Sequence, residues 1–459
     1  MTAQSTEEAL LGRDGFARLA DAALDADLGG AVAGVEVLLQ REAGGLTRFA
    51  NSQIHQNVWR EDLAANVRVA TDDGRVGVAS VHTDDPAVVA STARQAAGIA
   101  RLSPPDPAFP GLAPMAKAGD VDVDEATLTS TPQDRAEAVR ALLAEVDERY
   151  EAAGTYRTQA DEIGVFNTEG QRSYAPRSSA ALTLVVTGPS SSGWAEDGGR
   201  SRSDIDPAAA GRRAVEKVRA GEDPVDVDAG RWTVVLEPPA VGTLAAYLAY
   251  MAFGGRDYLE GRSYAAGRLG EPVADARVSL ADDPRSPHAG GYPVDYEGTP
   301  TSRVELLASG KLQSVVHDRN TAKQAGTEST GNALPAPNTY GPMALYPMFA
   351  PGDGGSTADL VAGCERGLLV TRFHYTNVLN HKDTTATGMT RDGTFLIEDG
   401  KVTAAVRNLR FTQSLMGALA QVEAVSSDTA FAGEGFEYGC RQPALRIAGF
   451  AFTGTTSFG

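Results

Sequence analysis

Histidine is the side chain best suited to hold a catalytic metal, and the spacing of the six histidines in this chain decides whether they can do so. A zinc hydrolase uses about three protein ligands and one open position, commonly two histidines at helical spacing beside a glutamate. His374 and His381 are seven residues apart, but their segment is predicted as a strand end and a loop, which does not bring them to one face. The set as a whole is more typical of surface or hydrogen-bonded histidines: His55, His82, His288, His317, His374 and His381.

Motifs for nucleophilic or phosphate chemistry are also missing. Cys364 and Cys440 have no adjacent histidine, and the serine-rich run 188–193 lacks the glycine spacing of a hydrolase elbow. The run 352–356 has neither the lysine of a phosphate-binding loop nor the fingerprint of a dinucleotide fold. The acid pair Asp282-Asp283 stands in polar, proline-flanked sequence, so we expect it to be solvated rather than to act in acid–base chemistry.

Two dense runs of polar residues remain unexplained by turns alone. The first covers 317–323 and continues at 328–332, and the second covers 377–391. Loops of this composition often bind ligands, but ordinary exposed loops have the same composition. From the residues alone, both interpretations stay open.

Composition limits the classes of function. The net charge of -19 and the pI near 4.8 argue against nucleic-acid binding, because affinity for phosphate backbones depends on lysine and arginine. No run of about 18 apolar residues occurs, and the opening residues lack the basic and apolar regions of a signal peptide. Two distant cysteines imply no disulfide framework. We therefore expect a cytoplasmic protein without a membrane or nucleic-acid partner.

The hydrophobic pattern predicts an α+β fold of two domains, with antiparallel or mixed sheets and flanking helices. Predicted strands occur in pairs, and the helices, such as one over 241–253, do not alternate regularly with them. An aspartate-rich run without periodicity at 221–230 marks the boundary between an N-terminal α+β domain (1–225) and a C-terminal β-rich domain (226–459).

Short turn motifs set the expected strand boundaries. Glu42-Ala43-Gly44 is predicted to join strands at 33–41 and 45–50, and Asp392-Gly393 and Asp399-Gly400 are predicted as two further turns. A strand is also expected over 312–318.

Several segments in order along most of the chain resemble the TldD/PmbA family of peptidases. They are the two polar runs together with Arg48–Gln56, Gly367–Arg372, Gly393–Glu398 and Gln442–Ile447. The resemblance implies a two-protein peptidase in which TldD-type subunits carry His-Glu-x-x-x-His and a later cysteine, whereas TldE/PmbA-type partners lack some or all of these ligands.

The resemblance also locates the equivalent of the zinc helix. Leu259-Glu260-Gly261 is similar to the Leu-Glu-Gly that follows the second histidine in TldD-type chains, which places Ala252 and Phe253 at the His-Glu pair and Asp257 at the second histidine. Alanine and phenylalanine can neither bind zinc nor activate its water. A shift of register does not help, because residues 250–258 contain no histidine and no glutamate.

The resemblance therefore implies a subunit of a cytoplasmic zinc metallopeptidase complex that itself has no catalytic residues and no cofactor. Zinc is expected in a TldD-type homologous partner, the substrate is an unfolded peptide held by strand addition, and a homodimer is a further possibility. Candidate peptide-binding residues, chosen by resemblance and composition, are Arg319, Asn332, His374, Asn377, His381 and Asp383.

Two alternatives stay open. The chain could be a stand-alone hydrolase with an unrecognised site around His374, His381 and Asp383. It could also be a non-enzymatic peptide-binding protein or a modulator of another assembly.

Overall fold

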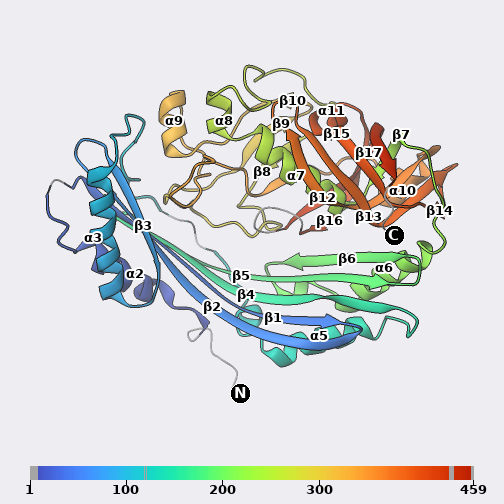
Figure 1. Ribbon diagram of the computed structural model, residues 1–459, viewed down its shortest axis with the longest axis horizontal. Coiled ribbons are helices and arrows are strands. Elements are labelled where there is room, and N and C mark those ends of the chain that lie inside the picture. The colour runs from blue at the N-terminus through green and yellow to red at the C-terminus, as the bar shows by residue number, and fades with distance from the viewer. Residues whose placement is uncertain (1–8, 31, 118, 120, 434–438, 456–459) are drawn as a thin grey trace.

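The computed structural model describes residues 9–30, 32–117, 119, 121–433 and 439–455 (Figure 1). A long curved sheet forms the N-terminal half, and a compact group of strands and helices forms the C-terminal half above its concave face. The predicted α+β class, with mixed and antiparallel sheets and flanking helices, is confirmed.

The N-terminal sheet has six antiparallel strands in the order β3-β2-β1-β4-β5-β6. Two groups of helices cover one face: α2 and α3 pack on β1 and β2, and α5 and α6 pack on β4 and β5. α3 begins where the Asp85 carboxylate accepts a hydrogen bond from the Ala87 amide and proline occupies the first turn. The strands are β1 (Gly34–Ala50), β2 (Gln53–Ala70), β3 (Val76–His82), β4 (Glu151–Asn167), β5 (Arg172–Thr187) and β6 (Ser192–Gly199). The helices are α2 (Gly12–Leu24), α3 (Pro86–Leu102), α4 (Glu125–Leu128), α5 (Pro132–Leu143), η1 (Arg202–Asp204) and α6 (Pro207–Ala220).

The turn predicted at residues 42–44 is wrong, because β1 runs unbroken for 17 residues. Its glycines serve packing instead of a turn. A Cβ atom on Gly45 would lie 2.0 Å from Cζ of Arg135, whose fully buried guanidinium donates to the Ser130 carbonyl and to Oγ1 of Thr158. Gly45 therefore makes room for an arginine that comes from α5.

In the C-terminal half, five strands close a ring of pairings: β7 pairs with β12 and β17, β17 with β15, β15 with β13, and β13 with β12. Only the β7–β12 pairing among these is parallel. The apolar helix α7 packs across β12 and β17, and the core gathers around it. The strands of this group are β7 (Gly230–Leu236), β12 (Arg366–Asn380), β13 (Thr385–Glu398), β14 (Lys401–Ala405), β15 (Leu409–Ser414), β16 (Val422–Ala432) and β17 (Cys440–Thr455).

A smaller sheet in the order β10-β9-β8-β11 completes this half. Of the strand predicted over 312–318, only the start belongs to β10. The rest is extended chain that leads into α9, and within it the Val316 amide donates to the Phe253 carbonyl at 2.9 Å. The remaining elements are α7 (Pro238–Ala252), α8 (Gly255–Leu259), β8 (Leu280–Asp282), β9 (Val304–Ala308), β10 (Lys311–Leu312), α9 (Arg319–Ala325), β11 (Pro347–Phe349), α10 (Thr357–Ala362) and α11 (Leu415–Leu419).

The two Asp-Gly motifs have different fates. Asp399-Gly400 forms the predicted turn between β13 and β14, whereas Asp392-Gly393 lies inside β13 at an irregularity opposite β12. Both residues of this second motif have positive φ, 54° and 131°. The Asp392 carboxylate accepts hydrogen bonds from Arg372 and Ser192, so the motif makes a bulge that joins the two halves.

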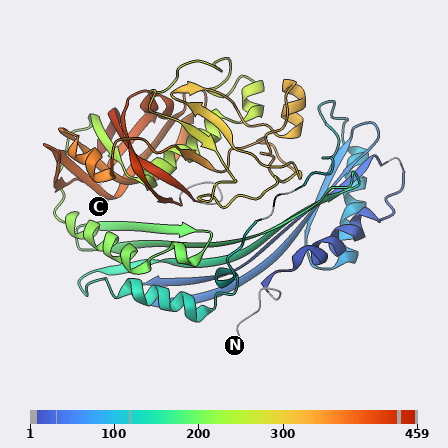
Figure 2. The same cartoon turned by 180° about the vertical axis from the view of Figure 1, so that it is seen from behind.

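Contacts between the halves are extensive, as seen from behind in Figure 2. Tyr292 and Tyr296 pack on the concave face of the sheet. Arg177 of β5 binds Asp161 of β4 at 2.9 Å, stacks over the Tyr292 ring and donates to the Gly290 carbonyl. Among the described residues, no helix has both the length and the apolar character needed to cross a membrane.

Candidate functional site

The end of α7 carries the two residues that correspond by resemblance to the zinc-binding pair. α7 is apolar on nearly all sides and begins with Pro238 and Pro239 in its first turn. Ala252 and Phe253 close it, and both are 0% exposed within the main core. Their side chains are therefore fixed by packing, and neither offers a donor atom to a ligand.

Asp257, the third corresponding residue, lies in α8 close to His381 at the tip of the β12–β13 hairpin. An oxygen of Asp257 is 3.9 Å from Nδ1 of His381, and the other oxygen binds Arg262 at 2.7 Å. The His381 ring lies edge-on to Tyr250, with ring centroids 4.9 Å apart, and its Nδ1 has no hydrogen-bond partner in the described structure. The fold thus brings together two residues that the sequence singled out for different reasons.

This corner does not fit a zinc ion. Asp257 and His381 supply two donors, and Arg262 already neutralises the carboxylate. Within the described ranges, no group of three histidine, cysteine, aspartate or glutamate side chains is placed to hold a metal. Zinc needs about three protein ligands, so the corner can orient a polar group but cannot polarise it as a metal would.

Arg319 and Asn332 are structural in the described contacts. Arg319, at the start of α9, donates to the Leu112 carbonyl in the N-terminal half at 3.0 Å. The buried Asn332 donates to Oδ2 of Asp282 at 2.6 Å and to the Met343 carbonyl at 3.2 Å. Both residues fasten loops together.

The expectation that Asp282 is solvated is wrong, because its side chain lies fully inside the protein. Burial raises its pKa to about 6, although hydrogen bonds from the Tyr346 amide and from Asn332 oppose the shift. The sequence could not show this, because Asn332 and Tyr346 lie 50 and 64 residues away.

The other candidates are spread along the β12–β13 hairpin. His374 lies opposite Met389 with its ring against Tyr375, and burial together with Arg372 and Arg391 lowers its pKa. Asn377 donates to the Tyr375 carbonyl, and Asp383 accepts from Asn380. Peptide contact by any of the six candidate residues stays a prediction.

A polar cavity of about 480 Å³ lies beside α8, between the two halves. Its charged lining residues lie in β2, in the loop that follows α3, in and just after α8, and in the segments that precede β9 and α9. No sequence motif joins this group, because its members are far apart in the chain; only Glu260 and Asp318 stand in segments that the sequence singled out. They are Arg68, Asp106, Arg256, Glu260, Glu297 and Asp318.

The electrostatics of this cavity are acidic. Arg68 is engaged by Glu36 at 2.7 Å and by Glu297 at 3.0 Å, so its charge is balanced. Four carboxyl groups line the cavity (Asp106, Glu260, Glu297 and Asp318) against the arginines Arg68 and Arg256, although burial raises the pKa of Asp318 and so favours its uncharged form. The cavity is therefore suited to polar or cationic groups, and it adjoins the Asp257–His381 corner through α8.

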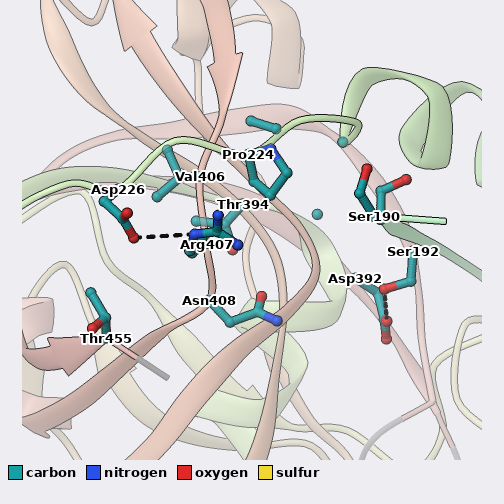
Figure 3. Close-up of a pocket in the computed structure, with 14 residues that line it drawn as sticks. Ser190, Ser192, Pro224, Asp226, Asp392, Thr394, Val406, Arg407, Asn408 and Thr455 are labelled. Carbon is teal, nitrogen blue, oxygen red and sulfur yellow. Dashed lines mark hydrogen bonds and ion pairs between the residues drawn. The ribbon is translucent and has the colours of Figure 1, made fainter. Parts of the chain in front are cut away.

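A second crevice of about 480 Å³ lies at the hinge between the halves (Figure 3). Figure 3 shows two contacts among its polar side chains: the Ser192 hydroxyl donates to Asp392 at 2.6 Å, and Arg407 lies 3.3 Å from Asp226. Because these groups satisfy each other, the crevice is best explained as part of the joint between the halves.

Neither thiol is available as a nucleophile. Cys364 and Cys440 are both buried, and burial raises the pKa of both. A buried protonated thiol is unreactive, so the cysteines belong to the packing.

Three sequence models of one family match consecutive parts of the chain. Residues 35–100 match the PmbA/TldA metallopeptidase domain 1, residues 117–221 its central domain and residues 229–454 its C-terminal domain. The family resemblance stated from the sequence is thereby confirmed.

Similar proteins agree with this match. A metalloprotease of Methanothermobacter thermautotrophicus is 28% identical over 222 residues, which are 48% of this chain and 47% of that protein. A metalloprotease of Archaeoglobus fulgidus is 36% identical over 108 residues, 23% of this chain and 24% of that protein, so the chain spans about half or less of these relatives. The crystal structure of TldE from Thermococcus kodakarensis has a TM-score of 0.83 at 23% identity, covering 92% of this chain and 97% of the other, and shows the shared fold.

Proposed function

This chain belongs to the PmbA/TldD metallopeptidase family, and we propose that it is the zinc-free subunit of a peptidase whose zinc lies in a TldD-type homologous partner. In this role the chain helps to enclose an unfolded peptide, and the partner supplies the metal-bound water. We further propose a cytoplasmic location, which the low cysteine content of two residues in 459 supports.

The observation that carries the proposal is the end of α7. Where a metal site would need an imidazole and a carboxylate, the chain has Ala252 and Phe253 packed inside an apolar core. Replacing them with histidine and glutamate would bury polar groups without partners, so these two positions serve the stability of the core.

The polar cavity beside α8 supports a role in holding a peptide. Its lining comes from both halves and combines carboxylates with arginines, which suits the amide groups and the charged ends of an extended chain. Strand addition would contribute backbone hydrogen bonds with little dependence on sequence.

A reconstitution experiment tests the proposal. We would purify the chain alone, a TldD-type homologue alone and the two together, and measure zinc by mass spectrometry and cleavage of an unfolded peptide. We expect substoichiometric zinc and no cleavage for this chain, and faster cleavage by the mixture than by the homologue alone. Stoichiometric zinc with cleavage by the lone chain would refute the proposal.

An observation that favours a stand-alone hydrolase is the approach of His381 to Asp257. The matched test compares His381→Ala with His288→Ala, an exposed histidine outside that site, in the isolated chain. If the His381→Ala chain lost peptide cleavage and the control variant kept it, the chemistry would be assigned to this corner. Peptide binding without cleavage, even with the homologue present, would instead favour a non-enzymatic binding protein.

A further inference from the structure

The arginine crevice, named for Arg157, Arg200 and Arg441 in its lining, is a space of about 240 Å³ between the concave face of the N-terminal sheet and the C-terminal half. Its described lining comes from β4, β5 and β6 on one side, and from β16, β17 and the segment 287–290 on the other. Figure 1 shows β16 close to β6, and the two strands are in contact. The arginine crevice has no described lining residue in common with the polar cavity beside α8 or with the crevice at the hinge.

The register of the sheet gives Arg157 room on the concave face. Arg157 of β4 lies opposite Ala181 of β5, which in turn lies opposite Gly198 of β6. Side chains in one such row point to the same face of a sheet, and alanine and glycine leave that face open. Phe431 of β16 closes the row, since a Cβ atom on Gly198 would lie 2.6 Å from Cζ of its ring. The Arg157 side chain therefore lies over a floor of small residues, under a wall from the other half.

The described lining carries an excess of positive charge. Arg157, Arg200 and Arg441 are all half-buried, and Asp204 is the one acid among the lining residues that the structure describes. One oxygen of Asp204 already accepts a hydrogen bond from the Ser201 amide at 3.0 Å. Three arginines beside one carboxylate stand out in a chain with a net charge of -19. Like charges that gather in a half-buried space repel one another, and a bound anion relieves the repulsion.

Two of the arginines are partly engaged, whereas the third is open. Arg200 donates to the Asp122 carbonyl at 3.1 Å, and Nε of Arg441 donates to Oγ1 of Thr429 at 3.2 Å. The Arg157 guanidinium forms no hydrogen bond and no ion pair with any residue that the structure describes. Arginine presents its donors in a planar fork that matches a carboxylate. Arg157 is therefore the donor that the arginine crevice can offer to a ligand.

The apolar part of the lining favours one kind of anion. Ala181, Ala289 and the ring of Phe431 line the same space as the arginines. A free phosphate would leave this apolar surface against water, whereas the carbon skeleton of an organic acid would cover it. The volume lies below the range of about 300–1,000 Å³ that is usual for drug-sized ligands, so the arginine crevice suits a small acid. One open guanidinium also matches one carboxylate, because the two form a bidentate pair.

We propose that the arginine crevice binds a small organic carboxylate, which pairs with Arg157 and lies against the ring of Phe431. Arg200 adds positive charge from the N-terminal half and Arg441 from the C-terminal half, so a bound acid links the two halves. This site is separate from the end of α7, and the inference does not depend on the proposed function.

Calorimetric titration of the isolated chain tests the class of ligand. Benzoate is the probe, and benzamide is its control, because the two share the ring and nearly the same shape while benzamide has no charge. We expect one benzoate to bind per chain and benzamide to bind at least roughly tenfold more weakly, since the charged pair with Arg157 is lost. Inorganic phosphate should also bind more weakly than benzoate, because it leaves the apolar lining uncovered.

Substitution of Arg157 tests the site. Arg157→Met keeps an unbranched side chain but removes the charge and the donors, and should weaken benzoate binding by roughly tenfold or more. Arg157→Lys keeps the charge without the planar fork and should bind with intermediate affinity. Arg410→Met is the matched control, since Arg410 is an exposed strand arginine outside the arginine crevice, and it should bind benzoate as the wild type does.

Thermal melts test the link between the halves. Saturating benzoate should raise the melting temperature of the wild type and of Arg410→Met, but not that of Arg157→Met. Without ligand, Arg157→Met should melt no lower than the wild type, because the guanidinium has no bond to a described residue. Arg441→Met, on the other side of the arginine crevice, should weaken benzoate binding several-fold, since Arg441 is already partly engaged by Thr429.

Four results would overturn the proposal. They are a wild-type chain without saturable benzoate binding, benzamide that binds as tightly as benzoate, an Arg157→Met chain that binds benzoate as tightly as the wild type, and inorganic phosphate that binds more tightly than benzoate. If circular dichroism shows Arg157→Met to be unfolded, Arg157→Lys takes its place, and wild-type affinity in that folded variant would refute the pairing with Arg157.

Discussion

Two pairs of a basic and an acidic side chain show how differently this protein treats polar groups. Arg177 and Asp161 are 2.9 Å apart, and their side chains are 2% and 1% exposed. His381 and Asp257 are 3.9 Å apart, with side chains 35% and 16% exposed. The first pair is closed in by Tyr292 and the Gly290 carbonyl, whereas in the second pair Nδ1 of His381 has no hydrogen bond in the described structure.

The comparison teaches that burial separates structural charge from available charge. A charge that is enclosed with an oppositely charged partner is costly to disturb, because removing one partner leaves the other buried, and the loss appears as loss of folding. The His381 side chain is 35% exposed and contributes less to stability; its exposed atoms are open to a ligand, whereas its Nδ1 is buried.

The largest effect is expected at the enclosed pair. Arg177→Ala leaves the Asp161 carboxylate buried without its main partner and should lower the free energy of unfolding by about 3–5 kcal/mol. Urea unfolding followed by tryptophan fluorescence measures the change. The double variant Arg177→Met/Asp161→Leu should recover much of the lost free energy of unfolding. If the single and the double variant were equally unstable, the unpaired Asp161 carboxylate would not be the cause of the loss.

A pH effect of similar size is expected at Asp282. Its pKa in the folded protein is raised to about 6 from 3.8, so the folded state holds the proton more tightly than the unfolded state. The stability from this group is complete below about pH 4 and is lost as the pH rises through about 6, a change of about 3 kcal/mol. Asp282→Asn should flatten the dependence between pH 4 and 7, and an equal slope in both proteins would contradict this assignment.

A smaller loss is expected where β1 makes room for Arg135. Gly45→Ala forces a methyl group into the guanidinium and should lower stability by roughly 1–3 kcal/mol. Gly98→Ala in α3 is the control, because nothing lies within 4 Å of its added Cβ, and it should raise stability by about 0.5–1 kcal/mol. The melting temperature should fall for Gly45→Ala and rise for Gly98→Ala. Shifts of the same sign would contradict the explanation that Gly45 makes room for Arg135.

The smallest effect on folding is expected at the open corner. His381→Ala should change the unfolding free energy by no more than about 0.5 kcal/mol, since it breaks no hydrogen bond of Nδ1. If the corner holds peptide in the proposed complex, the same variant should raise the KM for an unfolded peptide several-fold with kcat nearly unchanged. A strong loss of stability would place His381 with the structural residues instead.

The amino-acid sequence by itself determined the fold class, the family and the nature of the α7 end. These follow from local signals: the apolar stretch of α7, the aspartate and proline that begin α3, and the absence of histidine and glutamate from residues 250–258. Capping and periodicity act over a few residues, so they can be recognised without knowledge of what packs nearby.

Only the tertiary structure decided what the glycines and the buried acids do. Asp392-Gly393 and Asp399-Gly400 have the same composition, yet one is a bulge held by Arg372 and Ser192 and the other is a turn. Gly45 makes room for a guanidinium from α5, and Asp282 is held by Asn332 and Tyr346, 50 and 64 residues further along. A glycine permits many backbone conformations, and a carboxylate takes its pKa from its surroundings, so the partner that arrives from elsewhere in the chain selects the outcome.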